Sequence, residues 1–209
     1  MIIAVDGPTA SGKGTVAAAI ARHFGLPHLD TGLLYRAVGR QVQLAGGDPD
    51  NADHALAGAS FPDSLLDDPE LRSEEIGGLA SRVSVHPAVR TALLDRQRLF
   101  ARADGGAVLD GRDIGTVICP DADVKLFVTA SLDARTDRRF AEMQGQGRDM
   151  TREEVYAQIE RRDARDMGRK DAPLKPAPDA RILDTTTLDK QASIAAAVAA
   201  VEEARLRRD

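Results

Sequence analysis

A glycine-rich segment near the start of the sequence has the residue types and spacing to bind a polyphosphate. It consists of Gly7, Pro8, Thr9, Ala10, Ser11, Gly12, Lys13, Gly14 and Thr15. Glycines permit the backbone angles that turn N–H groups toward an anion, and the start of a following helix adds positive potential. In such a segment the lysine side chain reaches the β- and γ-phosphates. We therefore predict a loop that binds a nucleoside triphosphate.

The hydroxyl residue of this loop is displaced from its usual place. Most loops of this kind carry Ser or Thr directly after the lysine, where the hydroxyl binds Mg²⁺. Here Gly14 follows Lys13, and the hydroxyl belongs to Thr15. We expect Thr15 to contact Mg²⁺, with the ion held mainly by phosphates and water. The apolar run before the loop and the helical pattern after it favour this interpretation over a chance turn.

A second set of cations is needed if a phosphoryl group passes to another phosphate, because the charge between donor and acceptor must be neutralised. The candidates are Arg36, then Arg112 in the cluster Asp110-Gly111-Arg112-Asp113, and finally Arg162, Arg165 and Arg169. The cluster follows an apolar run, at the end of a predicted strand where open α/β sheets bind ligands. A surface turn with self-paired charges is the alternative.

The later arginines recur at i, i+3 and i+7, which aligns them on one helix face if the helix extends to Arg169. Alternating Arg and Asp is also typical of a solvated helix with exposed salt bridges. A flap that closes over a transferring phosphoryl group must supply cations and exclude water. On that hypothesis we expect catalytic roles for Lys13, Arg112, Arg162 and Arg169.

Strand-like runs alternate with helical patterns along the chain. The expected strands are 2–5, 28–29, 107–109, 124–128 and 181–183, and the expected helices are 13–23, 34–44, 88–102, 132–144, 152–165 and 190–207. Thr185, Thr186 and Thr187 are plausible capping residues for the last helix. The alternation predicts an α/β fold with a parallel sheet.

Two segments interrupt this alternation, and we interpret both as excursions from a single domain. The predicted core comprises 1–45, 85–144 and 179–209, and the excursions comprise about 46–84 and about 145–178. A chain of 209 residues with 43% hydrophobic residues can bury one good core.

Composition excludes several classes of protein. A net charge of −5 argues against a nucleic-acid binder, which needs surplus cations. No apolar run of about 18 residues suggests a membrane span, and no basic and then apolar leader follows Met1. The single Cys119 fits a reducing compartment and is expected to be a buried hydrophobe. We expect a cytoplasmic monomer that binds neither membrane nor nucleic acid.

Taken together, the motifs resemble those of the bacterial cytidylate kinases over nearly the whole chain. They are 7–15, 30–36, 80–83, 89–90 with 96–98, 110–113 with 115–117, 162–169 and 183–186. The resemblance implies a P-loop NTPase fold with a five-stranded parallel sheet flanked by helices, in which 46–84 is an NMP-binding excursion and 145–178 a lid. It also implies that ATP, with Mg²⁺, phosphorylates CMP and dCMP.

The same resemblance implies roles for individual residues. Arg36, Arg112 and Arg169 would bind the CMP phosphate; Arg162 and Asp166 the sugar; Ser81, Arg90 and Asp113 the cytosine; and Thr31 and Tyr35 would line the pocket. The sequence departs from familiar members because the segment between Arg36 and Ser81 is short and lacks the alternation of a three-stranded insert. Thr31 also stands where serine is usual.

Two other functions stay open on the sequence. A kinase for UMP or AMP would need base-reading groups other than Arg90 and Asp113. A regulatory NTP-binding switch is the second, although the Asn-Lys-x-Asp sequence of guanine-specific switches does not occur here. Whether ATP turnover waits for an added monophosphate separates an enzyme from a switch.

Overall fold

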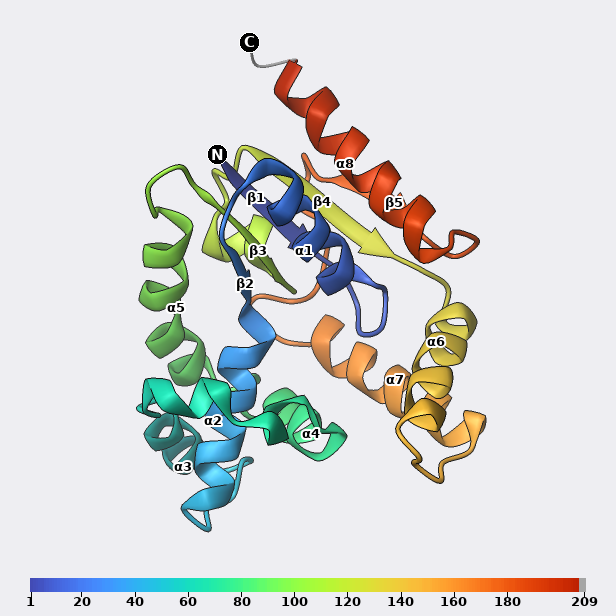
Figure 1. The fold of residues 1–209 in the computed structure, drawn as a ribbon. Helices are drawn as coiled ribbons and strands as arrows, with labels where there is room; N and C mark the ends of the chain where they lie inside the picture. The colour runs from blue at the N-terminus through green and yellow to red at the C-terminus, as the bar shows by residue number, and fades with distance from the viewer. Residues whose placement is uncertain (207–209) are drawn as a thin grey trace. The chain divides into compact units, whose positions relative to one another are not determined.

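The computed structural model describes residues 1–206, which divide into two compact units. One unit contains Met1–His28 and the chain from Ala101 onward, and the other contains Leu29–Phe100. The second unit includes more residues than the 46–84 excursion expected from the sequence. The division into a core, an NMP-binding excursion and a lid stays a prediction. Each unit is described by itself (Figure 1).

A five-stranded sheet organises the first unit, which contains all of its strands except the last two residues of β2. The strands are β1 (Ile2–Asp6), β2 (His28–Asp30), β3 (Ala107–Gly111), β4 (Val124–Thr129) and β5 (Arg181–Asp184), in the order β2-β3-β1-β4-β5. β1 pairs in parallel with both β3 and β4, and β4 pairs in parallel with β5. The predicted α/β fold is confirmed. Buried and mostly apolar residues fill β1 and β3 because helices cover the sheet.

The strand register determines which loops emerge together. Asp6, the last residue of β1, lies opposite Gly111, the last residue of β3. Because parallel strands end at the same edge of a sheet, the phosphate-binding loop after Asp6 and the Arg112 segment after Gly111 leave the sheet as neighbours.

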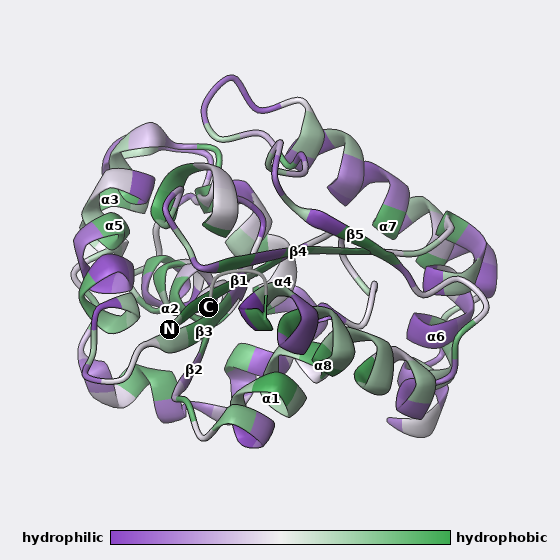
Figure 2. Ribbon diagram, turned by 90° about the horizontal axis from the view of Figure 1, so that it is seen from above, coloured by the Kyte–Doolittle hydropathy of each residue, from purple (hydrophilic) through white to green (hydrophobic). Residues whose placement is uncertain are grey.

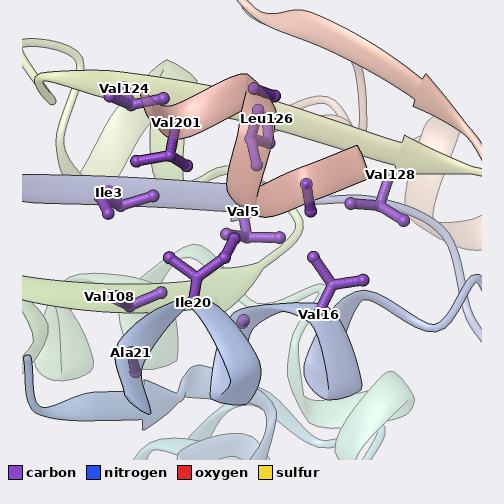
Figure 3. Close-up of a cluster of buried hydrophobic side chains, with 13 residues drawn as sticks. Ile3, Val5, Val16, Ile20, Ala21, Val108, Val124, Leu126, Val128 and Val201 are labelled. Carbon is purple, nitrogen blue, oxygen red and sulfur yellow. The ribbon is translucent and has the colours of Figure 1, made fainter. Parts of the chain in front are cut away.

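Helices α1 (Lys13–Phe24) and α8 (Lys190–Leu206) pack against the sheet. Figure 3 shows Val16 and Ile20 of α1 directed toward the strands, and both are almost completely buried. α8 begins after Asp189, whose carboxylate accepts the N–H of Ala192 at 2.8 Å. The expectation that a threonine caps this helix is therefore wrong, because the chain turns for several residues before the helix begins.

Two further helices of the first unit, α6 (Leu132–Gly145) and α7 (Arg152–Met167), pack against each other. Thr151 and Glu154 form a capping box at the start of α7, which fixes that end of the helix. Figure 2 shows that α6 and α7 are largely hydrophilic, whereas the central strands are hydrophobic. Among residues 1–206, no helix has the length and apolar character to cross a membrane.

The second unit is helical. It contains α2 (Thr31–Leu44), α3 (Ala52–Gly58), two 3₁₀ turns (Asp63–Asp67 and Pro69–Arg72), α4 (Glu74–Val83) and most of α5 (Pro87–Ala101). α2 begins three residues earlier than expected because the Asp30 side chain caps it by accepting the N–H of Gly32. Segment 46–84 has no strand, as its lack of alternation indicated.

Candidate functional site

The phosphate-binding loop is shaped by close approach to the sheet. A Cβ on Gly7 would lie 2.1 Å from the carbonyl oxygen of Val128 on β4, so only glycine fits there. Gly12 has a φ of +86° and is the residue before α1. No side chain caps α1, and its first turn carries no acidic residue. The start of α1 therefore presents main-chain N–H groups and positive potential suited to an anion.

A buried hydroxyl in this loop also indicates a ligand. The Oγ atom of Ser11 is buried and has no hydrogen-bond partner among residues 1–206, although a buried hydroxyl normally has one. Ser11 is held through its carbonyl oxygen, which accepts a 3.2 Å bond from the Thr185 hydroxyl. A bound polyphosphate would supply the acceptor that this hydroxyl lacks.

Arg112 connects three parts of the first unit. Its Nη2 donates to the Thr9 hydroxyl in the phosphate-binding loop at 2.7 Å, and its Nε donates to Asp166 Oδ2 on α7 at 2.8 Å. Its side chain is 19% exposed and that of Asp166 only 7%. The structure thus brings together three residues that the sequence nominated separately, from positions far apart in the chain.

The charges in this cluster support one another. Burial alone would raise the pKa of Asp166, but Arg112, Arg169 and Arg162 lower it below its ordinary value. Burial alone would lower the pKa of Arg112, but Asp166, followed by Asp110 and Asp163, raises it. Both groups are therefore ionised at neutral pH, and the arginine carries a positive charge beside the glycine-rich loop.

Arg169 lies beyond the helix on which it was expected. α7 ends at Met167 because the next residue, Gly168, disfavours helix. The i, i+3, i+7 alignment is therefore wrong for Arg169, which instead folds back so that its Nε donates to the carbonyl oxygen of Asp166 at 3.3 Å. Its side chain is 5% exposed. The solvated-helix alternative fits Arg165, which is exposed, but not this buried end.

In the second unit, Arg36 is held by main-chain carbonyl groups. Its Nη1 donates to the carbonyl oxygens of Leu71 at 2.7 Å and Ser73 at 2.8 Å. The guanidinium passes so close to α4 that a Cβ on Gly77 would lie 2.8 Å from Nη2. These contacts therefore hold the side chain along α4.

The predicted base-reading residues of the second unit, Ser81 and Arg90, lie on α4 and α5, and the predicted pocket-lining residues, Thr31 and Tyr35, lie on α2. The guanidinium of Arg90 lies 5.6 Å from the centre of the Tyr35 ring and makes a long 3.5 Å bond to the Ser84 carbonyl. Ser81 and Thr31 are buried, at 7% and 3% exposure. The structure thus joins Arg90 and Tyr35 directly within this unit.

Several polar residues of the first unit were not assigned roles from the sequence. The Oδ1 atom of the buried Asp110 accepts a 2.7 Å bond from His28 Nε2, and a Cβ on Gly14 would lie 3.7 Å from Asp110 Oδ2. Arg135 on α6 donates to the Thr9 carbonyl at 3.1 Å and pairs with Asp163 on α7 at 2.6 Å. A role for Asp110 could have been predicted, because it is an acidic residue at the end of a strand beside the loop. Nothing in the sequence indicates a role for Arg135.

The sequence is similar to those of known proteins. Residues 3–203 match the sequence model of the cytidylate kinase family. The cytidylate kinase of Methylocella silvestris is 54% identical over 205 residues, covering 98% of this chain and 95% of that protein. That of Xanthobacter autotrophicus is 53% identical over 208 residues, covering 100% of both.

A solved structure shares the fold at low identity. It is an uncharacterized protein from Eubacterium ventriosum, 15% identical, with a TM-score of 0.54 and 98% of each chain covered. The nearly full-length match to the family model and the identities above 50% are decisive. This chain therefore belongs to the cytidylate kinase family of nucleoside monophosphate kinases.

Proposed function

We propose that this protein transfers the γ-phosphoryl group of ATP to the phosphate of CMP and dCMP, giving CDP or dCDP and ADP. The observation that carries the proposal is Arg112, which bonds to the phosphate-binding loop through Thr9 and to the α7 end through Asp166. An arginine in that position contacts the acceptor phosphate next to the loop that holds the donor. Phosphoryl transfer depends on such positioning and charge neutralisation.

On the donor side, the main-chain N–H groups of 7–15 hold the phosphates of ATP, and Lys13 follows the γ-phosphoryl group into the transition state. The Ser11 hydroxyl donates to a phosphate oxygen, which satisfies its buried Oγ. No covalent intermediate with the protein is needed, because the acceptor phosphate oxygen attacks the γ-phosphorus directly while the bond to ADP breaks.

Mg²⁺ fits the oxygen donors at the start of α1. Thr15 is exposed there, and the buried Asp110 carboxylate lies beside Gly14. A hydroxyl and one carboxylate, completed by phosphate oxygens and water, are a typical Mg²⁺ environment. Bound to ATP, Mg²⁺ neutralises phosphate charge.

On the acceptor side, the arginine forks bind the CMP phosphate and the remaining groups bind sugar and base. Arg36, Arg112 and Arg169 hold the phosphate, Arg162 and Asp166 the sugar, Ser81, Arg90 and Asp113 the cytosine, and Thr31 and Tyr35 the pocket wall. Arginine suits this task because its planar fork binds phosphate oxygens in pairs. The burial of Arg169 at 5% exposure supports its role, since the surrounding residues restrict where its guanidinium group can lie.

Base selectivity follows from opposite hydrogen-bonding character. Cytosine offers acceptors at O2 and N3 for the Arg90 fork and a donor at its 4-amino group for the Asp113 carboxylate. Uracil presents O4 to that carboxylate, acceptor against acceptor. A site with unpaired buried polar groups can reject such a ligand by up to about 10⁴-fold.

We further propose that the protein acts as a cytoplasmic monomer without a nucleic-acid partner. The net charge of −5 and the single buried Cys119 support this. Light scattering at assay concentration measures the mass, and a dimer mass would contradict the proposal.

A coupled ADP-release assay with CMP, dCMP, UMP and AMP tests the function. We expect ADP release only after a monophosphate is added, with CMP and dCMP preferred. In Asp113→Asn the ratio of kcat/KM for CMP to kcat/KM for UMP should be smaller than in the parent. Lys13→Ala should reduce kcat/KM by roughly 10³-fold, whereas Lys190→Ala, at an exposed residue of α8, serves as its matched control. ATP turnover without a monophosphate would instead identify a switch, and equal use of UMP would remove the base-reading roles.

A further inference from the structure

Asp6 is a buried carboxylate that the roles above do not use. It is the last residue of β1, directly before Gly7 of the phosphate-binding loop, and is 4% exposed. Its Oδ1 accepts the main-chain N–H of Ile114 and its Oδ2 that of Gly115, both at 2.8 Å. Each carboxylate oxygen therefore holds one N–H group of a distant segment.

That segment is a π-helical turn, Ile114–Ile118. The turn is closed by the carbonyl oxygen of Asp113, which accepts the N–H groups of Val117 at 2.9 Å and Ile118 at 3.2 Å. Turns of this kind are rare and occur frequently at functional sites. Because Asp113 precedes the turn directly, its position depends on how the turn is fastened to the sheet.

Asp6 holds the chain on both sides of two proposed ligand-binding residues. Upstream, Gly111 is its partner in the parallel β1–β3 ladder. Downstream, Ile114 and Gly115 donate to its side chain. Arg112 and Asp113 are the two residues between these attachments.

We propose that Asp6 is a positioning residue for phosphoryl transfer, which holds Arg112 and Asp113 in place by fastening the chain before and after them to the end of β1. Since the phosphate-binding loop begins at the next residue, donor and acceptor contacts share one anchor. A misplacement of about 1 Å can lower a rate by roughly 10²-fold. This inference rests on the roles proposed for Arg112 and Asp113.

The charge state of Asp6 provides a separate readout. Burial raises its pKa to about 7, opposed by the bonds from Gly115 and Ile114 and by Arg112, and reinforced by Asp113. Lys125 also faces the turn, since a Cβ on Gly115 would lie 3.2 Å from its Cδ. The ionised carboxylate accepts both N–H groups, whereas protonation places an O–H against one of them. Positioning is therefore strongest above pH 7 and weakens as pH falls through that value.

Stability has the opposite pH dependence. The pKa of Asp6 is higher in the folded protein than its ordinary value of 3.8, so its contribution to stability is present below 3.8 and is lost as pH rises through about 7. A role in positioning and a role in stability therefore predict opposite trends with pH, and the two can be measured separately.

The test compares Asp6→Asn with Asp123→Asn. Asp123 makes the same kind of bond at the other end of β1, where its Oδ2 accepts the N–H of Ile2 at 2.7 Å. In Asp6→Asn the amide keeps one acceptor but turns an NH₂ toward a main-chain N–H. We expect kcat/KM for CMP to fall by roughly tenfold or more, with the Kd for ATP within about twofold of the parent. Asp123→Asn should leave both unchanged.

The ratio of kcat/KM in the parent to that in Asp6→Asn should rise as pH increases through about 7. Titration of the CMP phosphate affects both proteins equally and cancels in this ratio. Urea unfolding gives the folding equilibrium constant of each protein. The constant of the parent divided by that of Asp6→Asn should fall as pH rises, by up to about tenfold per pH unit. A flat kinetic ratio, or kinetics equal to those of Asp123→Asn, would reduce Asp6 to a structural residue.

Asp6→Glu gives a second test if Asp6→Asn does not fold. It keeps a carboxylate but lengthens the side chain by one methylene group, so its oxygens can no longer occupy the positions that accept the N–H groups of Ile114 and Gly115. We expect the same selective loss of kcat/KM for CMP, and unchanged kinetics in this variant would refute the positioning role. A parent protein without CMP-dependent ADP release would refute the proposed function itself, which is a different outcome.

Discussion

The sheet with α1 and α8, and the helix pair α6–α7, are held together differently although both belong to one compact unit. The sheet encloses a large apolar cluster to which Ile3, Val5, Ile20 and Val201 contribute. The helix pair buries a small apolar cluster, Met143, Val155 and Ile159. The helix pair is also joined by a buried ion pair. Arg135 on α6 binds Asp163 on α7 at 2.6 Å, and the two side chains are 7% and 11% exposed.

This difference separates stability from response to ligand. Apolar burial is strong and non-directional, so the sheet keeps its form whether or not a nucleotide is bound. Buried ion pairs contribute little net stability but are sensitive to a new charge nearby. The helix pair also touches the phosphate-binding loop, through Arg135 on the Thr9 carbonyl and through Ala10 in its apolar cluster. We infer that bound phosphates act on the helix pair first.

The largest expected effect is on catalysis. Arg169→Ala should lower kcat by roughly 10³-fold, equivalent to about 4 kcal/mol, because it removes a cation completed at the transferring phosphoryl group. The Kd for ATP should change little. Arg165→Ala, an exposed arginine of the same segment, is the matched control. Stopped-flow transfer and equilibrium binding measure the two quantities, and equal losses in both variants would mean that burial of Arg169 has no catalytic meaning.

The same substitution in each region sharpens the comparison. Ile20→Ala in the sheet cluster should lower the free energy of unfolding by about 3 kcal/mol, since Ile20 is fully buried. Its kcat/KM should stay near that of the parent at temperatures where it is folded. Ile159→Ala on α7, at 2% exposure, should lower kcat/KM by about tenfold because α7 carries Asp163 and Asp166. Urea unfolding measures the stability of both variants, and steady-state kinetics measure their kcat/KM. A larger loss of kcat/KM in Ile20→Ala than in Ile159→Ala would contradict the proposed difference between the two regions.

The smallest expected effect is an acid dependence of the helix pair. Because Arg112, Arg169 and Arg162 outweigh burial, the pKa of Asp166 is below its ordinary 3.8. Its stabilising contribution is therefore present above 3.8 and lost as pH falls through the folded pKa. Near pH 6 the free energy of unfolding of the parent should exceed that of Asp166→Asn by about 1 to 2 kcal/mol. Urea unfolding from pH 3 to 7 should show that this difference decreases in acid. A difference that does not change with pH would assign the effect to packing.

Local patterns in the sequence were sufficient for the sheet. The apolar runs 2–5, 107–109 and 124–128 predicted three central strands that extend only one or two residues further. The helices α3 and α4 within 46–84 were missed, because they are short and α4 contains Gly77 and Gly78, which disfavour helix. Packing against α2 overrides that preference in the folded chain.

The candidate site was predictable where its chemistry is local. The phosphate-binding loop and the Arg112 cluster are contiguous motifs, and the structure brings Thr9, Arg112 and Asp166 into contact. Asp6 and Arg135 could not be found this way, because their bonds join residues 108 and 126 positions apart. A lone acid or arginine in a strand or helix carries no sign of such a distant partner.

The burial of Cys119 determines how movement in this protein can be followed. It is the sole cysteine of the sequence and is 4% exposed, so a maleimide dye meets little competing thiol in the folded protein. Arg165→Cys on α7 and Leu99→Cys on α5 would add two exposed thiols, one on each compact unit, without removal of the native one. A donor and an acceptor dye at these positions would convert the separation of the units into a fluorescence signal during turnover.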